Sequence, residues 1–207
     1  MSEQKGGFAG MLKLGVVMAL YATVACVGLA FVYEGTMKVI EQRQQDDLDA
    51  ALKELFHNAD SFDPIDNIRS PDPAVTIEEG GAFVARTNGG EIVGAALRVS
   101  RASYNGAIKT LVGVGVDGKI SGVKILENND TPGLGANAAS STYYIDRSKG
   151  IHFYDQFTGK SVSDPFEPKQ DVVAITAATI TSRAVAAEVK AAGEAALVWF
   201  ASQGGSR

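Results

Sequence analysis

The chain is poor in cysteine and histidine, which limits the chemistry that its own side chains can perform. Its 207 residues include one cysteine, Cys26, and two histidines, His57 and His152. A single thiol cannot form an internal disulfide, nor a zinc or iron–sulfur site built from several cysteines. The two histidines lie outside any metal-ligand spacing. We therefore predict no metal site, and no acid–base or nucleophile–histidine pair predicts a catalytic residue.

An excess of positive charge is also missing. The chain has 19 Lys and Arg against 24 Asp and Glu, a formal charge of -5, and no run of basic residues. Proteins that bind nucleic acids use Lys and Arg to replace the counterions of the phosphate backbone. The acidic balance therefore argues against a nucleic-acid partner.

What the sequence does contain is a long uncharged segment near its N-terminus. The 20 residues from Leu14 to Tyr33 carry no charge. As a helix they would be about 30 Å long, roughly the hydrocarbon thickness of a lipid bilayer. A cleavable signal peptide would have a shorter apolar region followed by small residues at a cleavage site, and neither feature is present. We therefore predict a single uncleaved transmembrane anchor at residues 14–33.

The charges around this segment predict its orientation. Lys5 and Lys13 precede it and acidic residues crowd after it, although Lys38 and Arg43 weaken the signal. By the positive-inside rule, we expect residues 1–13 in the cytoplasm and the main domain on the periplasmic or outer side.

The rest of the chain predicts an α+β domain, with a mainly antiparallel sheet flanked by helices. Residues 34–73 would form a juxtamembrane helix, capped by Thr36 and ending near Asn58, and then a linker from Asp60 to Pro73. The domain itself would occupy residues 74–201, and residues 202–207 would be a flexible tail.

Two β-hairpins are predicted from their turn residues, because Asn-Gly and Asp-Gly supply the positive φ that tight turns need. The expected strands are residues 83–87 and 91–100 in the first hairpin and 108–116 and 119–126 in the second. Gly113, Gly115 and Gly118 match the G-x-G-x-x-G pattern of dinucleotide-binding loops. That fingerprint requires a helix after the glycines, whereas a strand is expected here, so we predict no direct NAD binding.

Two segments have the composition of a ligand site. In residues 129–135, NDTPGLG, the proline presets a turn and the glycines allow a ligand to approach the backbone closely, although an ordinary turn has the same composition. Residues 176–183 carry four hydroxyl side chains where a short apolar strand at 172–176 is expected to meet a long helix. That helix would begin at Thr181 or Ser182 and end at Phe200. Its free N–H groups would favour a phosphate, but an ordinary Thr- and Ser-rich cap is equally compatible with the composition.

Several motifs together resemble one family. Residues 174–185, AITAATITSRAV, are similar to the flavinylation motif of FMN-binding subunits, usually Ser/Thr-Gly-Ala-Thr-x-Ser/Thr. Further stretches resemble the same family in the same order: YNG at 104–106 with 108–116, KILENNDTPGLG at 124–135 and QFTGK at 156–160. Together with the anchor, they make the sequence similar to the G subunit of the Rnf ion-translocating electron-transport complex. The C subunit of the sodium-translocating NADH:quinone reductase is related but typically longer.

This resemblance implies a covalent cofactor. FMN would be joined to Thr179 through a phosphoester by a separate flavin transferase that uses FAD. The physical chemistry is compatible, because a threonine hydroxyl is a poor nucleophile without an external base and a helix N-terminus holds a negative charge. Arg183, in the first turn of the expected helix, could add a charge-assisted contact to the phosphate. The further predicted cofactor-binding residues are Thr176, Ala177, Ala178, Thr181, Ser182, Thr131, Pro132, Gly133, Leu134, Gly135, Glu127 and Tyr104.

The chain departs from the family pattern at two positions. Ala177 stands where the family usually has glycine, and Val173 where it often has aspartate. If that glycine serves a positive φ, alanine there costs about 1 kcal/mol or more. If it serves only close approach to a ligand, a methyl group can be accommodated.

The resemblance implies an electron relay in a bacterial inner-membrane complex that couples ferredoxin and NAD redox chemistry to Na⁺ or H⁺ movement. Its partners would be the other membrane and peripheral subunits, the lipid bilayer and, during maturation, the flavin transferase. Three alternatives remain open at this point. They are a structural or assembly subunit without flavin, an anchored protein that binds FMN non-covalently, and a component of a sodium-translocating NADH:quinone reductase that is similar to its C subunit.

Overall fold

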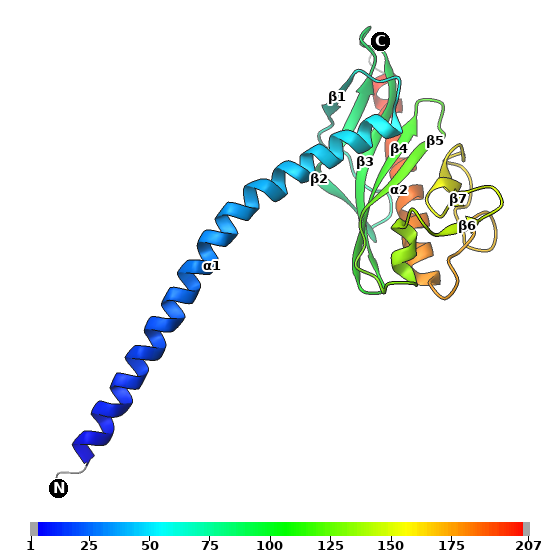
Figure 1. The fold of residues 1–207 in the computed structure, drawn as a ribbon. Helices are drawn as coiled ribbons and strands as arrows, with labels where there is room; N and C mark the ends of the chain where they lie inside the picture. Colours follow the sequence, from blue (N-terminus) through cyan, green and yellow to red (C-terminus); the bar gives the residue numbers. More distant parts are fainter. Residues whose placement is uncertain (1–3, 205–207) are drawn as a thin grey trace. The chain divides into compact units, whose positions relative to one another are not determined.

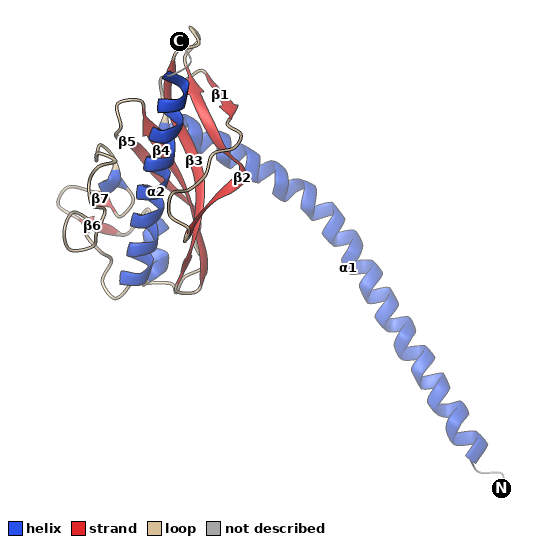
Figure 2. Ribbon diagram, turned by 180° about the vertical axis from the view of Figure 1, so that it is seen from behind, coloured by secondary structure: helices blue, strands red, loops and turns tan. Residues whose placement is uncertain are grey.

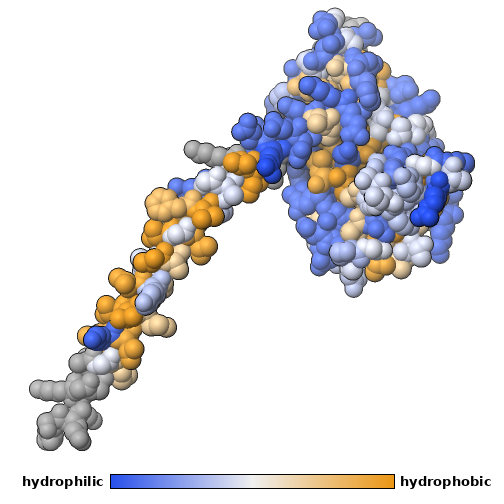
Figure 3. Space-filling view, in the orientation of Figure 1, coloured by the Kyte–Doolittle hydropathy of each residue, from blue (hydrophilic) through white to orange (hydrophobic). Residues whose placement is uncertain are grey.

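The computed structural model describes residues 4–204, which belong to two compact units, residues 1–49 and 50–207. The described part of the first unit is helical: helix α1 begins at Gln4 and continues to Leu55, which belongs to the second unit (Figure 1). Within it, Gly10–Met37 is long and apolar enough to cross a membrane. Its large apolar side chains are exposed and follow one another along the helix (Figure 3).

The separate juxtamembrane helix that we expected is not present, because α1 continues without a break. Thr36 does not act as an N-cap, since its hydroxyl donates to the carbonyl of Val32, one turn earlier in the same helix. Gly35 alone does not end the helix, because a glycine costs only about 1 kcal/mol relative to alanine. α1 ends at Leu55, before the predicted end near Asn58.

The second unit is built on a five-stranded antiparallel sheet, which confirms the predicted fold class. The strands, in spatial order, are β1 (Ser61–Pro64), β2 (Val75–Arg86), β3 (Ile92–Ser103), β4 (Gly106–Gly115) and β5 (Ile120–Glu127). Both predicted hairpins are present, with positive φ at Gly90 and Gly118 in their turns. β1 lies inside the predicted linker and pairs with β2, so part of that segment is ordered by sheet hydrogen bonds.

Helix α2 (Thr179–Gly204) covers one face of this sheet, where it packs on β3 and β4 (Figure 2). Small side chains let the helix approach the strands, and those fully buried include Ala184, Ala191, Ala192, Ala195 and Ala196. α2 begins earlier than predicted and runs beyond Phe200 into the expected tail. Leu197, near the C-terminal end of the helix, is exposed. Residues 205–207 of that tail lie outside the described residues.

The opposite face of the sheet receives the segment from Ala51 to Phe56, which is part of the second unit. Glycines on three neighbouring strands make room for it. A Cβ atom added at Gly122 would lie 2.8 Å from Leu55 Cδ2, and one at Gly113 would lie 3.2 Å from Leu55 Cβ. At Gly94 it would meet the ring of Phe56. The glycine pattern that imitates a dinucleotide motif therefore has a packing role at Gly113.

The remaining elements are short. They are the 3-10 helices η1 (Gly135–Ala139) and η2 (Asp155–Phe157) and the paired strands β6 (Tyr144–Asp146) and β7 (Ile151–His152). Residues 172–176 do not form the expected strand. Val172 makes only an isolated bridge with Pro168, because its N–H and C=O groups bond within the turn from Glu167 to Val172.

Candidate functional site

The N-terminus of α2 follows a tight turn whose third residue is Ala177. The N–H of Ala178 donates to the carbonyl of Ile175 at 3.0 Å, and Ala177 has a φ of 58°. A positive φ at this position occurs in type II turns, which favour glycine because it has no Cβ. Of the two explanations for the family's glycine, the structure therefore supports the backbone conformation. Alanine here carries strain of roughly 1 kcal/mol or more.

The hydroxyl of Ser182 holds this turn against the helix. Ser182 Oγ donates to the carbonyl of Ala178 at 2.9 Å and accepts the N–H of Ile175 at 3.0 Å. The side chain is fully buried. The hydroxyl hydrogen of Ser182 is therefore not available to a ligand, and this residue stabilises the turn that precedes Thr179.

The first turn of α2 offers backbone N–H groups to a ligand. The first hydrogen bond of the helix runs from the N–H of Ser182 to the carbonyl of Ala178, at 3.0 Å. The N–H groups of Thr179, Ile180 and Thr181 consequently have no acceptor within the helix. Together with the helix dipole, these groups favour a phosphate or another anion beside Thr179.

A cavity of about 560 Å³ opens beside Thr179. It is lined by Tyr104, Asp130, Thr131, Leu134, Gly135, Ala177, Ala178, Thr179, Ile180 and Thr181. Three segments far apart in the sequence thus meet here: the turn between β3 and β4, the loop before η1 and the start of α2. The volume is typical of small-molecule sites, and apolar side chains with a few polar groups are their usual lining.

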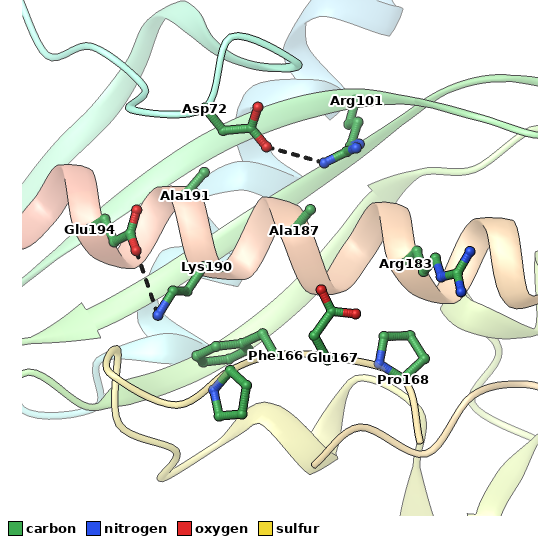
Figure 4. Close-up of a pocket in the computed structure, with 11 residues that line it drawn as sticks. Asp72, Arg101, Phe166, Glu167, Pro168, Arg183, Ala187, Lys190, Ala191 and Glu194 are labelled. Carbon is green, nitrogen blue, oxygen red and sulfur yellow. Dashed lines mark hydrogen bonds and ion pairs between the residues drawn. The ribbon is translucent and has the colours of Figure 1, made fainter. Parts of the chain in front are cut away.

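Not every predicted site residue reaches this cavity. Those that do not line it are Thr176, Ser182, Arg183, Pro132, Gly133 and Glu127. Glu127 points to Lys109 instead, with Nζ 2.6 Å from a carboxylate oxygen, and the hydrogen bond from Lys109 holds the pKa of Glu127 below its usual range. Arg183 lines a different pocket of about 490 Å³, which also contains Phe166 and Lys190 (Figure 4).

Asp130 and Ile180 also line the cavity; both lie in the two segments singled out in the sequence, but neither was among the predicted cofactor-binding residues. Ile180 is exposed at the rim, whereas Asp130 is only 5% exposed. The carboxylate of Asp130 accepts hydrogen bonds from the hydroxyls of Ser103 and Thr181 and from the N–H of Asn105. The motif that contains Asp130 does not indicate this role, because the partners of the carboxylate come from other parts of the chain.

Comparison with known protein families agrees with this site. Residues 103–194 match the model of the FMN-binding domain, and residues 1–55 match that of the RnfG N-terminal region. The first match contains all three segments that surround the cavity. The fold and the site therefore define an FMN-binding domain that follows an apolar N-terminal helix.

Relatives with curated names align over most of the chain. The G subunit of the Na(+)-translocating ferredoxin:NAD(+) oxidoreductase complex of Acetobacterium woodii is 30% identical, over 86% of this chain and 88% of the relative. The G subunit of the ion-translocating oxidoreductase complex of Shewanella baltica is 31% identical, over 92% and 89%. The G subunit of the proton-translocating ferredoxin:NAD(+) oxidoreductase complex of Clostridium ljungdahlii is 30% identical, over 83% and 86%. The chain belongs to this family, the G subunits of ion-translocating oxidoreductase complexes, which confirms the resemblance seen in its motifs.

A solved structure, that of NqrC from Shewanella oneidensis, is also similar. It aligns with a TM-score of 0.44 and 15% identity, covering 67% of this chain and 74% of that chain. This likeness is too distant to bear on function.

Proposed function

We propose that this chain is an electron-transfer subunit of a membrane-bound, ion-translocating ferredoxin:NAD oxidoreductase complex, and that it carries FMN as a phosphoester on Thr179. The observation that carries the proposal is the cavity beside Thr179, at a helix N-terminus inside the FMN-binding match. The relatives are subunits of complexes with this activity. The partners would accordingly be the other membrane and peripheral subunits of a Rnf-type complex.

The residues around the cavity fit FMN. A phosphoester on Thr179 would lie beside the N–H groups of Thr179, Ile180 and Thr181, which suit its negative charge. Exposed apolar side chains at the rim, Tyr104, Leu134 and Ile180, would contact the isoalloxazine ring. The loop from Thr131 to Gly135 would form the wall next to it.

When bound, FMN supplies one- and two-electron transfer, and the chain contributes binding, orientation and electrostatics. Attachment needs a partner, because the hydroxyl of Thr179 is a weak nucleophile. A flavin transferase would supply the base that takes the hydroxyl proton. The Thr179 oxygen would form a bond to the FMN phosphorus of FAD while the pyrophosphate bond breaks and AMP leaves.

Intact mass and in-gel fluorescence test the attachment directly. The full chain, co-expressed with a flavin transferase, should gain the mass of an FMN phosphoester and give a fluorescent band after denaturation in SDS. Thr179→Ala should lose both signals. Thr176→Ala is the matched control, because it removes an exposed hydroxyl of the same turn that does not line the cavity, and it should keep both. A chain without the band, or a band that persists in Thr179→Ala, would overturn the assignment.

We also propose that residues 14–33 anchor the chain in the bacterial inner membrane, with residues 1–13 in the cytoplasm and the flavin domain on the periplasmic or outer side. The support is the apolar stretch of α1 and the lysines before it. Protease added to intact spheroplasts should digest the domain. Complete protection would place it in the cytoplasm instead.

A second candidate function is a structural or assembly subunit that has no flavin. One observation favours it: Ala177 has a positive φ, at the position where the flavinylation motif usually has glycine, so the turn before Thr179 is strained. The intact mass decides between the two functions, because a chain without flavin keeps its unmodified mass beside an active transferase.

A further inference from the structure

We propose that Asp130 is a positioning residue of this site: its buried carboxylate joins the three walls of the cavity and places a fixed negative charge beside the flavin. The inference rests on the proposed function and deepens it, because it names a group that sets the shape of the cavity and the flavin's reduction potential.

The hydrogen bonds of Asp130 connect one loop to both of its neighbours. Oδ2 accepts the hydroxyl of Ser103 at 2.6 Å, from the end of β3, and the hydroxyl of Thr181 at 2.6 Å, from the first turn of α2. Oδ1 accepts the N–H of Asn105 at 2.7 Å, in the turn between β3 and β4. A single side chain therefore fixes the distance between the helix that would hold the phosphate and the hairpin that would face the ring.

The loop holds this carboxylate in one position. A Cβ atom added at Gly135 would lie 2.7 Å from Asp130 Cβ and would also meet the hydroxyl of Thr181, so the backbone packs directly against the pair. Asn128 braces the loop from the other side, since its Oδ1 accepts the N–H of Asp130 at 3.0 Å and its Nδ2 donates to the carbonyl of Gly135 at 2.9 Å. The aspartate has little freedom to turn away from the cavity.

The carboxylate is charged at neutral pH. Burial opposes ionisation, but the hydrogen bonds from Ser103, Thr181 and the backbone of Asn105 hold the pKa of Asp130 below its usual range. Within residues 4–204, no Lys, Arg or His forms an ion pair with it. Its negative charge is thus stabilised by dipoles but not neutralised. Reduction adds electrons to the flavin, so a fixed negative charge nearby disfavours it.

The test uses the full chain, co-expressed with a flavin transferase. Asp130→Asn keeps the size of the side chain and removes the charge. We expect a smaller flavinylated fraction by intact mass. In the molecules that do carry flavin, we expect the ratio of fully reduced to oxidised flavin at a fixed potential to rise about tenfold, equivalent to about 30 mV for this two-electron couple.

Two further variants separate charge, position and folding. Asp171→Asn is the matched control, because Asp171 also accepts the N–H groups of Phe166 and Glu167, and pairs with Lys160, but does not line the cavity. It should leave the potential unchanged. Thr181→Val removes one hydrogen bond and keeps the charge of Asp130, so it should lower the flavinylated fraction while moving the potential less than Asp130→Asn does.

The outcomes are distinct. If the unaltered chain carries no covalent flavin, the proposed function fails. If the unaltered chain is loaded but Asp130→Asn, folded by circular dichroism, matches it in loading and in potential, only the role of Asp130 is refuted. A potential that moves equally in Asp171→Asn would also refute it. If Asp130→Asn does not fold, Thr181→Val decides, and normal loading in that variant overturns the positioning role.

Discussion

Two buried carboxyl groups, one beside the first turn of α2 and one on the helix itself, have pKa values shifted in opposite directions. Asp130, beside the first turn of the helix, accepts three hydrogen bonds and has a lowered pKa. Glu188, in the middle of the helix, is fully buried, and burial raises its pKa to about 8. Among the described residues, Thr110 is the one side chain that donates a hydrogen bond to Glu188, from its hydroxyl to Oε2 at 2.5 Å. Oε1 of Glu188 has no hydrogen-bond partner among these residues.

The difference comes from depth and from the supply of donors together, because Glu188 lies deeper in the protein and accepts fewer hydrogen bonds than Asp130. Desolvation disfavours the ionised form at both sites. At the end of the helix, hydroxyl and backbone donors compensate for it. In the middle, the hydroxyl of Thr110 and the backbone of Arg101 lower the pKa of Glu188 by less than burial raises it, and the nearby charges of Arg101 and Glu78 act in opposite directions. Glu188 is therefore neutral at pH 7, and Asp130 is ionised.

The largest expected effect concerns Glu188→Gln. The pKa of this carboxyl rises from its ordinary value of 4.5 to about 8 on folding, so between these values the folded chain binds more protons than the unfolded chain. The contribution of Glu188 to stability is fully present below pH 4.5 and is lost as the pH rises to about 8. At about 1.4 kcal/mol per pKa unit, the loss is on the order of a few kcal/mol.

Glu188→Gln should therefore remove most of the fall in stability between about pH 5 and 8, as measured by denaturant unfolding of the full chain in detergent. Glu194→Gln is the matched control, because Glu194 is partly exposed on the same helix and pairs with Lys190. It should leave the slope unchanged. If the free energy of unfolding falls with pH equally steeply in Glu188→Gln and in the unaltered chain, Glu188 is not the titrating group.

Thr110→Val should have an intermediate effect. It removes the one side-chain donor to Glu188 without opening a cavity, so the carboxyl loses its stabilising contact and its pKa should rise further. We expect a loss of about 1–2 kcal/mol in the free energy of unfolding at about pH 6. The double variant Thr110→Val with Glu188→Gln measures the coupling of the pair, and additive losses would mean that the hydrogen bond contributes nothing.

Ala177→Gly, in the turn before the first turn of α2 and close to Asp130, should have the smallest effect. Glycine adopts the positive φ of this turn without strain, but it also has greater freedom in the unfolded chain. The free energy of unfolding should therefore either rise or stay within about 1 kcal/mol of its value in the unaltered chain. Because the turn precedes Thr179, the flavinylated fraction should increase. An unchanged fraction would show that Ala177 does not limit attachment.

Much of the fold was predictable because its signals are local. Asn88-Gly89-Gly90 and Asp117-Gly118 indicate the hairpin turns, and the apolar stretch of α1 has a length that strands do not reach. β1 was not predictable, because residues 61–64 contain aspartate and proline and are ordered only by pairing with β2. The prediction that a new helix starts at Thr36 was wrong, because a threonine hydroxyl can donate to a carbonyl one turn earlier in the same helix as well as cap a helix.

The site was predictable only in part. Thr179 and the residues from Thr131 to Gly135 follow from short motifs. The role of Asp130 depends on partners 25 to 51 residues away, which no local pattern encodes. The burial of Glu188 has a local signal, because this residue lies three positions after Val185 and four before Ala192, on the apolar stripe of the helix.

The packing of Leu55 and Phe56 on the glycines of the sheet has a practical consequence for truncation. The segment from Ala51 to Phe56 is largely buried, and Glu54 also pairs with Lys124 at 2.8 Å. A fragment that starts at residue 74, the boundary expected from the sequence, would lack both β1 and the segment from Ala51 to Phe56. The glycines and apolar side chains that this segment covers on the sheet would then be exposed to water. Such a fragment should aggregate, whereas one that starts after the apolar stretch, which ends at Met37, and before Ala51 should remain soluble. The last turn of α1 and Phe56 thus belong to the packed interior of the domain, and not to the membrane anchor.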